Sequence, residues 1–123
     1  DDAYYGFLQE HTRILAGVRV VTEAALIPLK ARAWLDLSER KASGVGSVDS
    51  KHIKKHRNDV LALAQLIGGT QRLDVPSAIR SDVARFIEGV QAETTVSLLQ
   101  DLSIDDSPED LWARMRALYG VPT

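Results

Sequence analysis

Apolar residues recur at helical spacing through most of the chain, and the longest such stretch runs from residue 22 to residue 67. In its first half, five residues share one broad face: Leu26, Leu29, Ala33, Trp34 and Leu37. A helix from Thr22, whose hydroxyl can cap the first turn, to about Lys41 accounts for this 3.6-residue period. Because proline lacks an amide donor and crowds the preceding turn, Pro28 predicts a kink or a delayed start near Ile27.

The second half of this stretch predicts another helix at about residues 50–68. Its inward side chains are expected to be Ile53, Val60, Leu63, Ala64 and Ile67. Asp49 or Ser50 can cap its start, and Gly68-Gly69 is expected to end it. Residues 42–47 hold two glycines and two serines, which predicts a linker short enough for an antiparallel helix hairpin.

Shorter elements are expected on both sides of this pair. The first eleven residues predict a short helix whose aromatic side chains dock on the core. Residues 12–21 predict a β-hairpin or a single strand, because valines alternate around a small turn. Later helical periods predict helices at about 76–91, 96–102 and 108–119, the last one capped by Ser107.

These elements predict a mainly α fold: a helical bundle with a long helix hairpin and a short N-terminal β-hairpin or strand. A chain of 123 residues can bury one real core, so residues 1–123 are expected to form a single helical domain. No apolar run approaches the length of a membrane span, so no membrane association is expected. The lack of cysteine excludes disulfides and thiolate metal sites and fits the cytoplasm.

Charge adds one local feature to this picture. The net charge of −2 gives no global attraction for nucleic acid. Within residues 51–57, however, six of seven side chains are basic or titratable: Lys51, His52, Lys54, Lys55, His56 and Arg57. Such a cluster can bind phosphate groups through charge-assisted hydrogen bonds, or it can be an ordinary solvated face. His52 and His56 have a metal-ligand spacing, but the adjacent lysines repel a cation, so no metal site is predicted.

Two further residues could carry chemistry with this cluster. Lys30 stands among small and apolar residues of the first long helix, and Asp59 follows the basic cluster on the second. Separate helices of one hairpin can bring this lysine and this acid together at a concave surface. The plainer alternatives are a lysine that extends its ammonium to water and an acid that is simply exposed.

The run from residue 26 to residue 63, LIPLKARAWLDLSERKASGVGSVDSKHIKKHRNDVLAL, resembles the C-terminal part of AbiEii-type nucleotidyltransferase-like proteins. These are abortive-infection toxins of the polymerase-β nucleotidyltransferase superfamily. Lys30 and Ala33 match the family's KxxA motif at a helix start, and Asp59 in HRNDVLAL matches its Asp in a basic-then-apolar helix. The preceding DDAYYGFLQE and the closing helices also resemble that region, so the likeness covers most of the chain.

The resemblance implies a catalytic site containing Lys30 and Asp59. The lysine would contact nucleotide phosphates and the Asp would support the site. Lys54, Lys55 and Arg57 would bind substrate by adding positive potential.

The family's Gly-Ser turn and paired metal-binding carboxylates have no match in this sequence. The resemblance therefore implies a missing N-terminal catalytic domain, with this chain as the C-terminal part of a longer bacterial protein and inactive alone. Magnesium and a nucleoside triphosphate would be cofactor and substrate of the full-length protein, since phosphoryl transfer needs metal ions. An antitoxin protein or an RNA acceptor would be a further partner. The alternative function is a non-enzymatic helical module that binds a protein or nucleic acid through residues 51–57.

Overall fold

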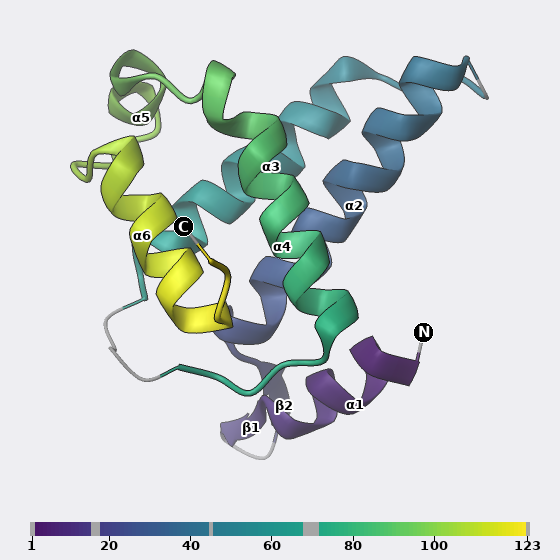
Figure 1. Cartoon of the computed structure of the whole chain (residues 1–123), viewed down its shortest axis with the longest axis vertical. Coiled ribbons are helices and arrows are strands. Elements are labelled where there is room, and N and C mark those ends of the chain that lie inside the picture. Colours follow the sequence, from purple (N-terminus) through teal and green to yellow (C-terminus); the bar gives the residue numbers. More distant parts are fainter. Residues whose placement is uncertain (1, 16–17, 45, 68–71, 123) are drawn as a thin grey trace.

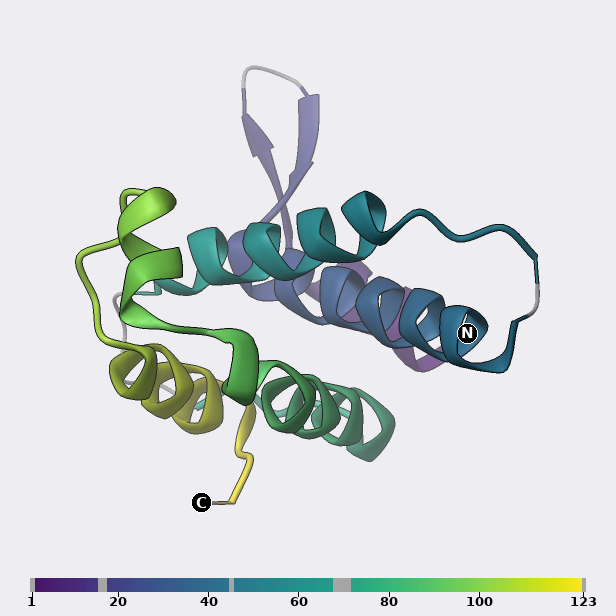
Figure 2. The same ribbon diagram turned by 90° about the horizontal axis from the view of Figure 1, so that it is seen from above.

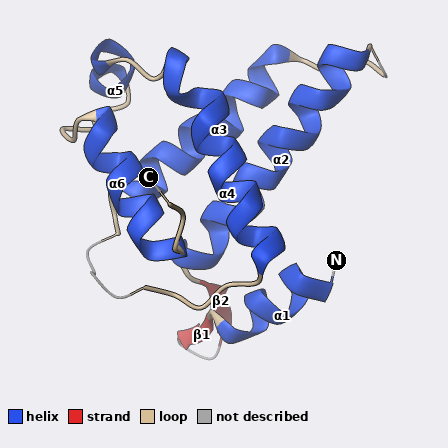
Figure 3. Ribbon diagram, in the orientation of Figure 1, coloured by secondary structure: helices blue, strands red, loops and turns tan. Residues whose placement is uncertain are grey.

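The structure is a computed structural model that describes residues 2–15, 18–44, 46–67 and 72–122. Within these residues it is mainly helical, as predicted, and the helices form a bundle (Figures 1 and 3). The elements in chain order are α1 (Asp2–Glu10), β1 (Thr12–Leu15), β2 (Val18–Val21), α2 (Glu23–Ser43), α3 (Ser50–Ala64), α4 (Ser77–Val90), the 3₁₀ turn η1 (Gln91–Glu93), α5 (Val96–Asp101) and α6 (Pro108–Tyr119).

The predicted helix hairpin is confirmed: α2 and α3 lie side by side, and α4 runs across α2 (Figures 1 and 2). Gly44 ends α2 with a φ of 72°, a left-handed conformation that glycine adopts at low cost. Asp49 caps α3 by accepting a hydrogen bond of 2.9 Å from the amide of Lys51. Helix α3 ends at Ala64, earlier than predicted, and the expected stop at Gly68-Gly69 lies outside the described residues.

Between α1 and α2, the two strands pair in antiparallel register from Thr12 opposite Val21 to Leu15 opposite Val18. This two-stranded sheet projects away from the helices (Figure 2). The amide and the hydroxyl of Thr22 both donate to the carbonyl of His11, at 3.1 and 2.9 Å. The predicted capping role of the Thr22 hydroxyl was therefore wrong, because this hydroxyl closes the strand pair instead.

The delayed start of α2 predicted from Pro28 was also wrong, since the helix is continuous from Glu23. Proline at position 28 removes the amide that would bond to the carbonyl of Ala24 one turn earlier. The hydroxyl of Tyr119, at the end of α6, donates to that carbonyl at 2.6 Å. A contact from a distant helix thus supplies the hydrogen bond that the proline removes.

Helix α2 buries a different face from the one predicted. The buried residues are Ala25, Ile27, Pro28, Ala31, Trp34 and Leu35. Of the predicted face, only Trp34 is buried, and Leu29 packs partly against the core. Apolar residues lie on two sides of this helix, and the packing of α3 and α4 determines which side is covered.

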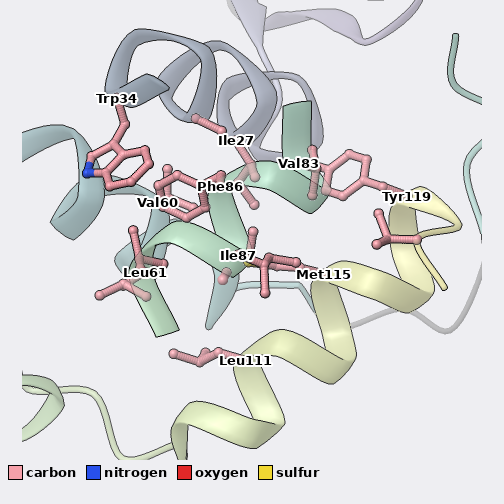
Figure 4. Packing of buried hydrophobic residues seen from close by; sticks show 14 of the residues in the cluster. Ile27, Trp34, Val60, Leu61, Val83, Phe86, Ile87, Leu111, Met115 and Tyr119 are labelled. Atoms are coloured by element: carbon pink, nitrogen blue, oxygen red, sulfur yellow. The ribbon is translucent and has the colours of Figure 1, made fainter. Parts of the chain in front are cut away.

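The core lies between the helix hairpin, α4 and α6 (Figure 4). All five residues of the predicted α4 stripe are buried: Ile79, Val83, Phe86, Ile87 and Val90. Helix α6 buries Leu111, Trp112 and Met115 as predicted, whereas Leu118 is only partly covered. Its predicted cap is confirmed, since Ser107 Oγ accepts a hydrogen bond of 3.1 Å from the amide of Asp110.

Gly89 in α4 lets the indole ring of Trp34 approach the helix. A Cβ at this position would lie 2.6 Å from Cη2 and 2.8 Å from Cζ3 of Trp34. Replacing a helical glycine with alanine normally stabilises by about 0.5–1 kcal/mol, but overpacking costs about 1–3 kcal/mol. We expect Gly89→Ala to lower the free energy of unfolding by about 1 kcal/mol in urea titrations.

Gly6 in α1 provides the matched control, because a Cβ there would meet nothing within 4 Å. Gly6→Ala should therefore raise the free energy of unfolding by about 0.5–1 kcal/mol. If both substitutions stabilise the protein equally, the Trp34 ring does not restrict position 89.

Candidate functional site

Lys30 and Asp59 meet across the helix hairpin, as predicted. Lys30 Nζ on α2 donates to Asp59 Oδ2 on α3 at 2.9 Å. Their side chains are 29% and 30% exposed, so the pair lies at the surface without being fully solvated. Lys55, one helical turn before Asp59, donates to the same oxygen at 3.0 Å. Two ammonium groups therefore share one carboxylate, and the local charge is positive.

The contacts determine the ionisation of the carboxylate. Partial burial alone would raise the pKa of Asp59, but hydrogen bonds from Lys30 and Lys55 favour the charged form, and the net result is a lowered pKa. A lysine ammonium has three N–H donors. Asp59 is the acceptor for Lys30 among the described residues, so the ammonium keeps donors that can reach an external anion.

His56 lies beside this pair, on the face of α3 that meets α2. Its Nδ1 is buried and has no hydrogen-bond partner within the described parts of the chain. Burial, followed by the nearby positive charge of Lys30, lowers the pKa of His56. The sequence indicated His56 only as a member of the basic cluster; its spacing of three residues from Asp59 was the signal that could have placed it here.

The predicted substrate-binding residues do not form one surface. Lys55 joins the Lys30–Asp59 pair, whereas Arg57 is buried and donates to Glu93 Oε1 at 2.8 Å and to Asn58 Oδ1 at 3.0 Å. A separate hollow of about 250 Å³ contains Arg57 and Lys54, and its other lining residues are Trp34, Ser38, Lys41, Ser50, Ile53 and Glu93. Residues adjacent in sequence thus face different parts of the molecule.

The resemblance implies magnesium for the full-length protein, and the Lys30–Asp59 pair itself is not suited to bind this ion. Asp59 Oδ2 already accepts from two ammonium groups, and both would repel a divalent cation. Over the described ranges, no group of three or more His, Cys, Asp or Glu side chains could hold a metal ion. We therefore assign no metal-dependent step to these residues.

No protein-family model matches this chain, and neither a curated protein nor a solved structure matches it. In the described residues, no helix has the length and apolar character needed to cross a membrane.

The site predicts acid destabilisation in two stages. The pKa of His56 is lowered from 6.5 and that of Asp59 from 3.8, so for both groups the unfolded chain binds protons more readily than the folded one. Stability should consequently fall as the pH drops below about 6.5, and again below about 4. Urea titrations from pH 7.5 to 3 measure both stages. His56→Gln should remove the first stage and Asp59→Asn the second; a His56→Gln profile identical to the parent's between pH 7 and 5 would contradict this assignment.

Proposed function

We propose that this chain is the C-terminal helical portion of a nucleotidyltransferase, in which Lys30 contacts nucleotide phosphates and Asp59 orients it. The observation that carries the proposal is the 2.9 Å contact between Lys30 Nζ and Asp59 Oδ2. These are the two residues that match the family's motifs, and they come from different helices, 29 positions apart.

The contact suits a phosphate-binding role on physical grounds. A free lysine side chain loses rotamer entropy when it binds an anion, and a carboxylate that already positions the ammonium reduces this cost. Lys55, with a side chain 66% exposed, adds a second positive charge at the same oxygen. The net positive charge remains available to a phosphate group.

The remaining parts of the reaction would lie outside the described residues. We propose that metal-binding carboxylates in an N-terminal catalytic domain hold magnesium and the nucleoside triphosphate, and that this chain alone is inactive. We propose that the complete protein acts in the cytoplasm. Its further partner would be an RNA acceptor or an antitoxin protein. Sequencing the DNA upstream of the codon for Asp1 tests this arrangement: a reading frame with a Gly-Ser motif followed by spaced acids is the expected result.

Lys30→Ala tests the role of the lysine. In the protein that carries the metal-binding carboxylates, we expect the dissociation constant for the nucleoside triphosphate to rise about tenfold, since one charge-assisted hydrogen bond is lost. Isothermal titration calorimetry measures the change. Arg40→Ala is the control, because Arg40 is an exposed basic residue of the same helix that lines neither the site nor the hollow of Lys54 and Arg57.

Equal affinity in the parent and the Lys30→Ala protein would contradict the nucleotide proposal. The alternative function, a module that binds nucleic acid through residues 51–57, is supported by the exposure of Lys51 and Lys54. It predicts that Lys30→Ala has no effect and that binding of an RNA oligonucleotide falls steeply with salt.

A further inference from the structure

Three arginines converge on one surface hollow formed by the segment before α4, the first turn of α4 and the end of α6. They are Arg72, Arg80 and Arg116, and the hollow has a volume of about 560 Å³. The amide of Leu73 donates to the carbonyl of Leu118 at 2.7 Å and holds the segment against α6. Figure 1 shows these three parts of the chain near one another. We call this surface the arginine hollow.

Packing brings these side chains together. A Cβ on Gly120, which has a φ of 69°, would lie 2.5 Å from Nε and 2.6 Å from Nη2 of Arg72, so the guanidinium lies directly against the glycine. Arg80 Nη2 donates to the carbonyl of Val75 at 3.2 Å. Arg80 Nε is buried and has no hydrogen-bond partner in the described part of the chain. At least one strong donor is therefore without an acceptor.

The arginine hollow contains no acidic residue among the described residues that line it. Four other arginines of the chain each contact a carboxylate within 3.2 Å: Arg32, Arg57, Arg85 and Arg114. None of the three in the hollow forms an ion pair with a described residue, although the chain has 17 acidic residues. Arg116 lies in the last turn of α6, where its positive charge interacts favourably with the helix dipole. This interaction explains the position of only one of the three arginines.

Like charges repel one another, so three guanidinium groups around one hollow are stabilised by an anion between them. Arginine binds phosphate oxygens with two parallel N–H donors, and it does so better than lysine. We propose that the arginine hollow binds the phosphate groups of a polyphosphate or of a nucleic-acid backbone. This inference is independent of the proposed function, since the hollow contains neither Lys30 nor Asp59.

Isothermal titration calorimetry of the chain with inorganic tripolyphosphate, in the absence of metal ions, tests the proposal. Arg72→Gln and Arg116→Gln should each weaken binding about tenfold, because each removes a charge-assisted pair of hydrogen bonds. Arg116→Lys should also weaken it, because the charge remains but the planar fork is lost. Arg40→Gln is the matched control: Arg40 also lies in the last turn of its helix, and it should bind as the parent does.

A parallel titration with a single-stranded RNA oligonucleotide distinguishes the two sources of phosphate. If the Arg72 and Arg116 variants lose affinity for tripolyphosphate but not for RNA, the hollow binds free polyphosphates. If they lose affinity for both ligands, the hollow binds a nucleic-acid backbone. Lys30→Ala should leave tripolyphosphate binding unchanged, so failure of one proposal does not affect the other. Circular dichroism confirms that each variant is folded. Absence of binding by the parent, or equal loss in Arg40→Gln, would overturn the proposal.

Discussion

Phe86→Ala is expected to lower the free energy of unfolding by about 3–5 kcal/mol. The side chain is fully buried in α4, and its ring meets that of Trp34 edge to face, with centroids 5.4 Å apart (Figure 4). Alanine would remove the buried apolar surface, leave a cavity between the helices and eliminate the aromatic contact. Because domains of this size are stable by only about 5–15 kcal/mol, this loss would be a large fraction of the total stability.

Urea denaturation followed by circular dichroism measures this loss. Tyr5→Ala is the matched control, because Tyr5 is an aromatic residue that is 65% exposed on α1. It should change the free energy of unfolding by no more than about 0.5 kcal/mol. Similar losses in the two variants would show that Phe86 is not in a closely packed core.

Tyr119→Phe is expected to destabilise the protein by about 1–2 kcal/mol, because it leaves a partly buried carbonyl without its hydrogen-bond donor. The hydroxyl of Tyr119 donates to the carbonyl of Ala24 at 2.6 Å, and Pro28 cannot supply the usual helical donor to that carbonyl. Burial raises the pKa of Tyr119, which keeps the hydroxyl protonated as a donor. Phenylalanine retains the ring and removes only this hydrogen bond.

A double-mutant cycle with Pro28→Ala isolates the cause. Alanine at position 28 restores an amide that can donate to the carbonyl of Ala24. Tyr119→Phe should therefore cost less in the Pro28→Ala protein than in the parent, and the difference is the coupling energy. An equal cost in both backgrounds would show that the Tyr119 hydroxyl does not compensate for the amide that Pro28 lacks.

The structural features that were predicted correctly are those fixed by residues close together in the sequence. The α4 stripe was correct because Ile79, Val83, Phe86 and their neighbours follow one clean helical period without a competing apolar face. The cap at Ser107 was correct for the same reason, since its partner amide is three residues away. In α2, by contrast, apolar residues lie on two faces, and the face predicted from the sequence to be buried was the wrong one.

In the candidate site, too, some features were predicted from the sequence and others were not. The meeting of Lys30 and Asp59 was predicted from motifs on two helices of one short hairpin, which limits the ways in which these helices can pack. The burial of Arg57 was not, because its partner Glu93 is 36 positions away and belongs to another element. The arginine hollow was also missed, since its three members are scattered in sequence.

By itself, then, the sequence determined where most helices form, how α6 begins and that α2 and α3 make a hairpin. Each of these depends on residues within a few turns of one another. Only the tertiary structure decided which face of α2 is covered, how the basic cluster divides and where the Ala24 carbonyl finds a donor. These outcomes depend on side chains from α4, η1 and α6, and neither period nor spacing along the chain specifies which of several compatible surfaces they meet.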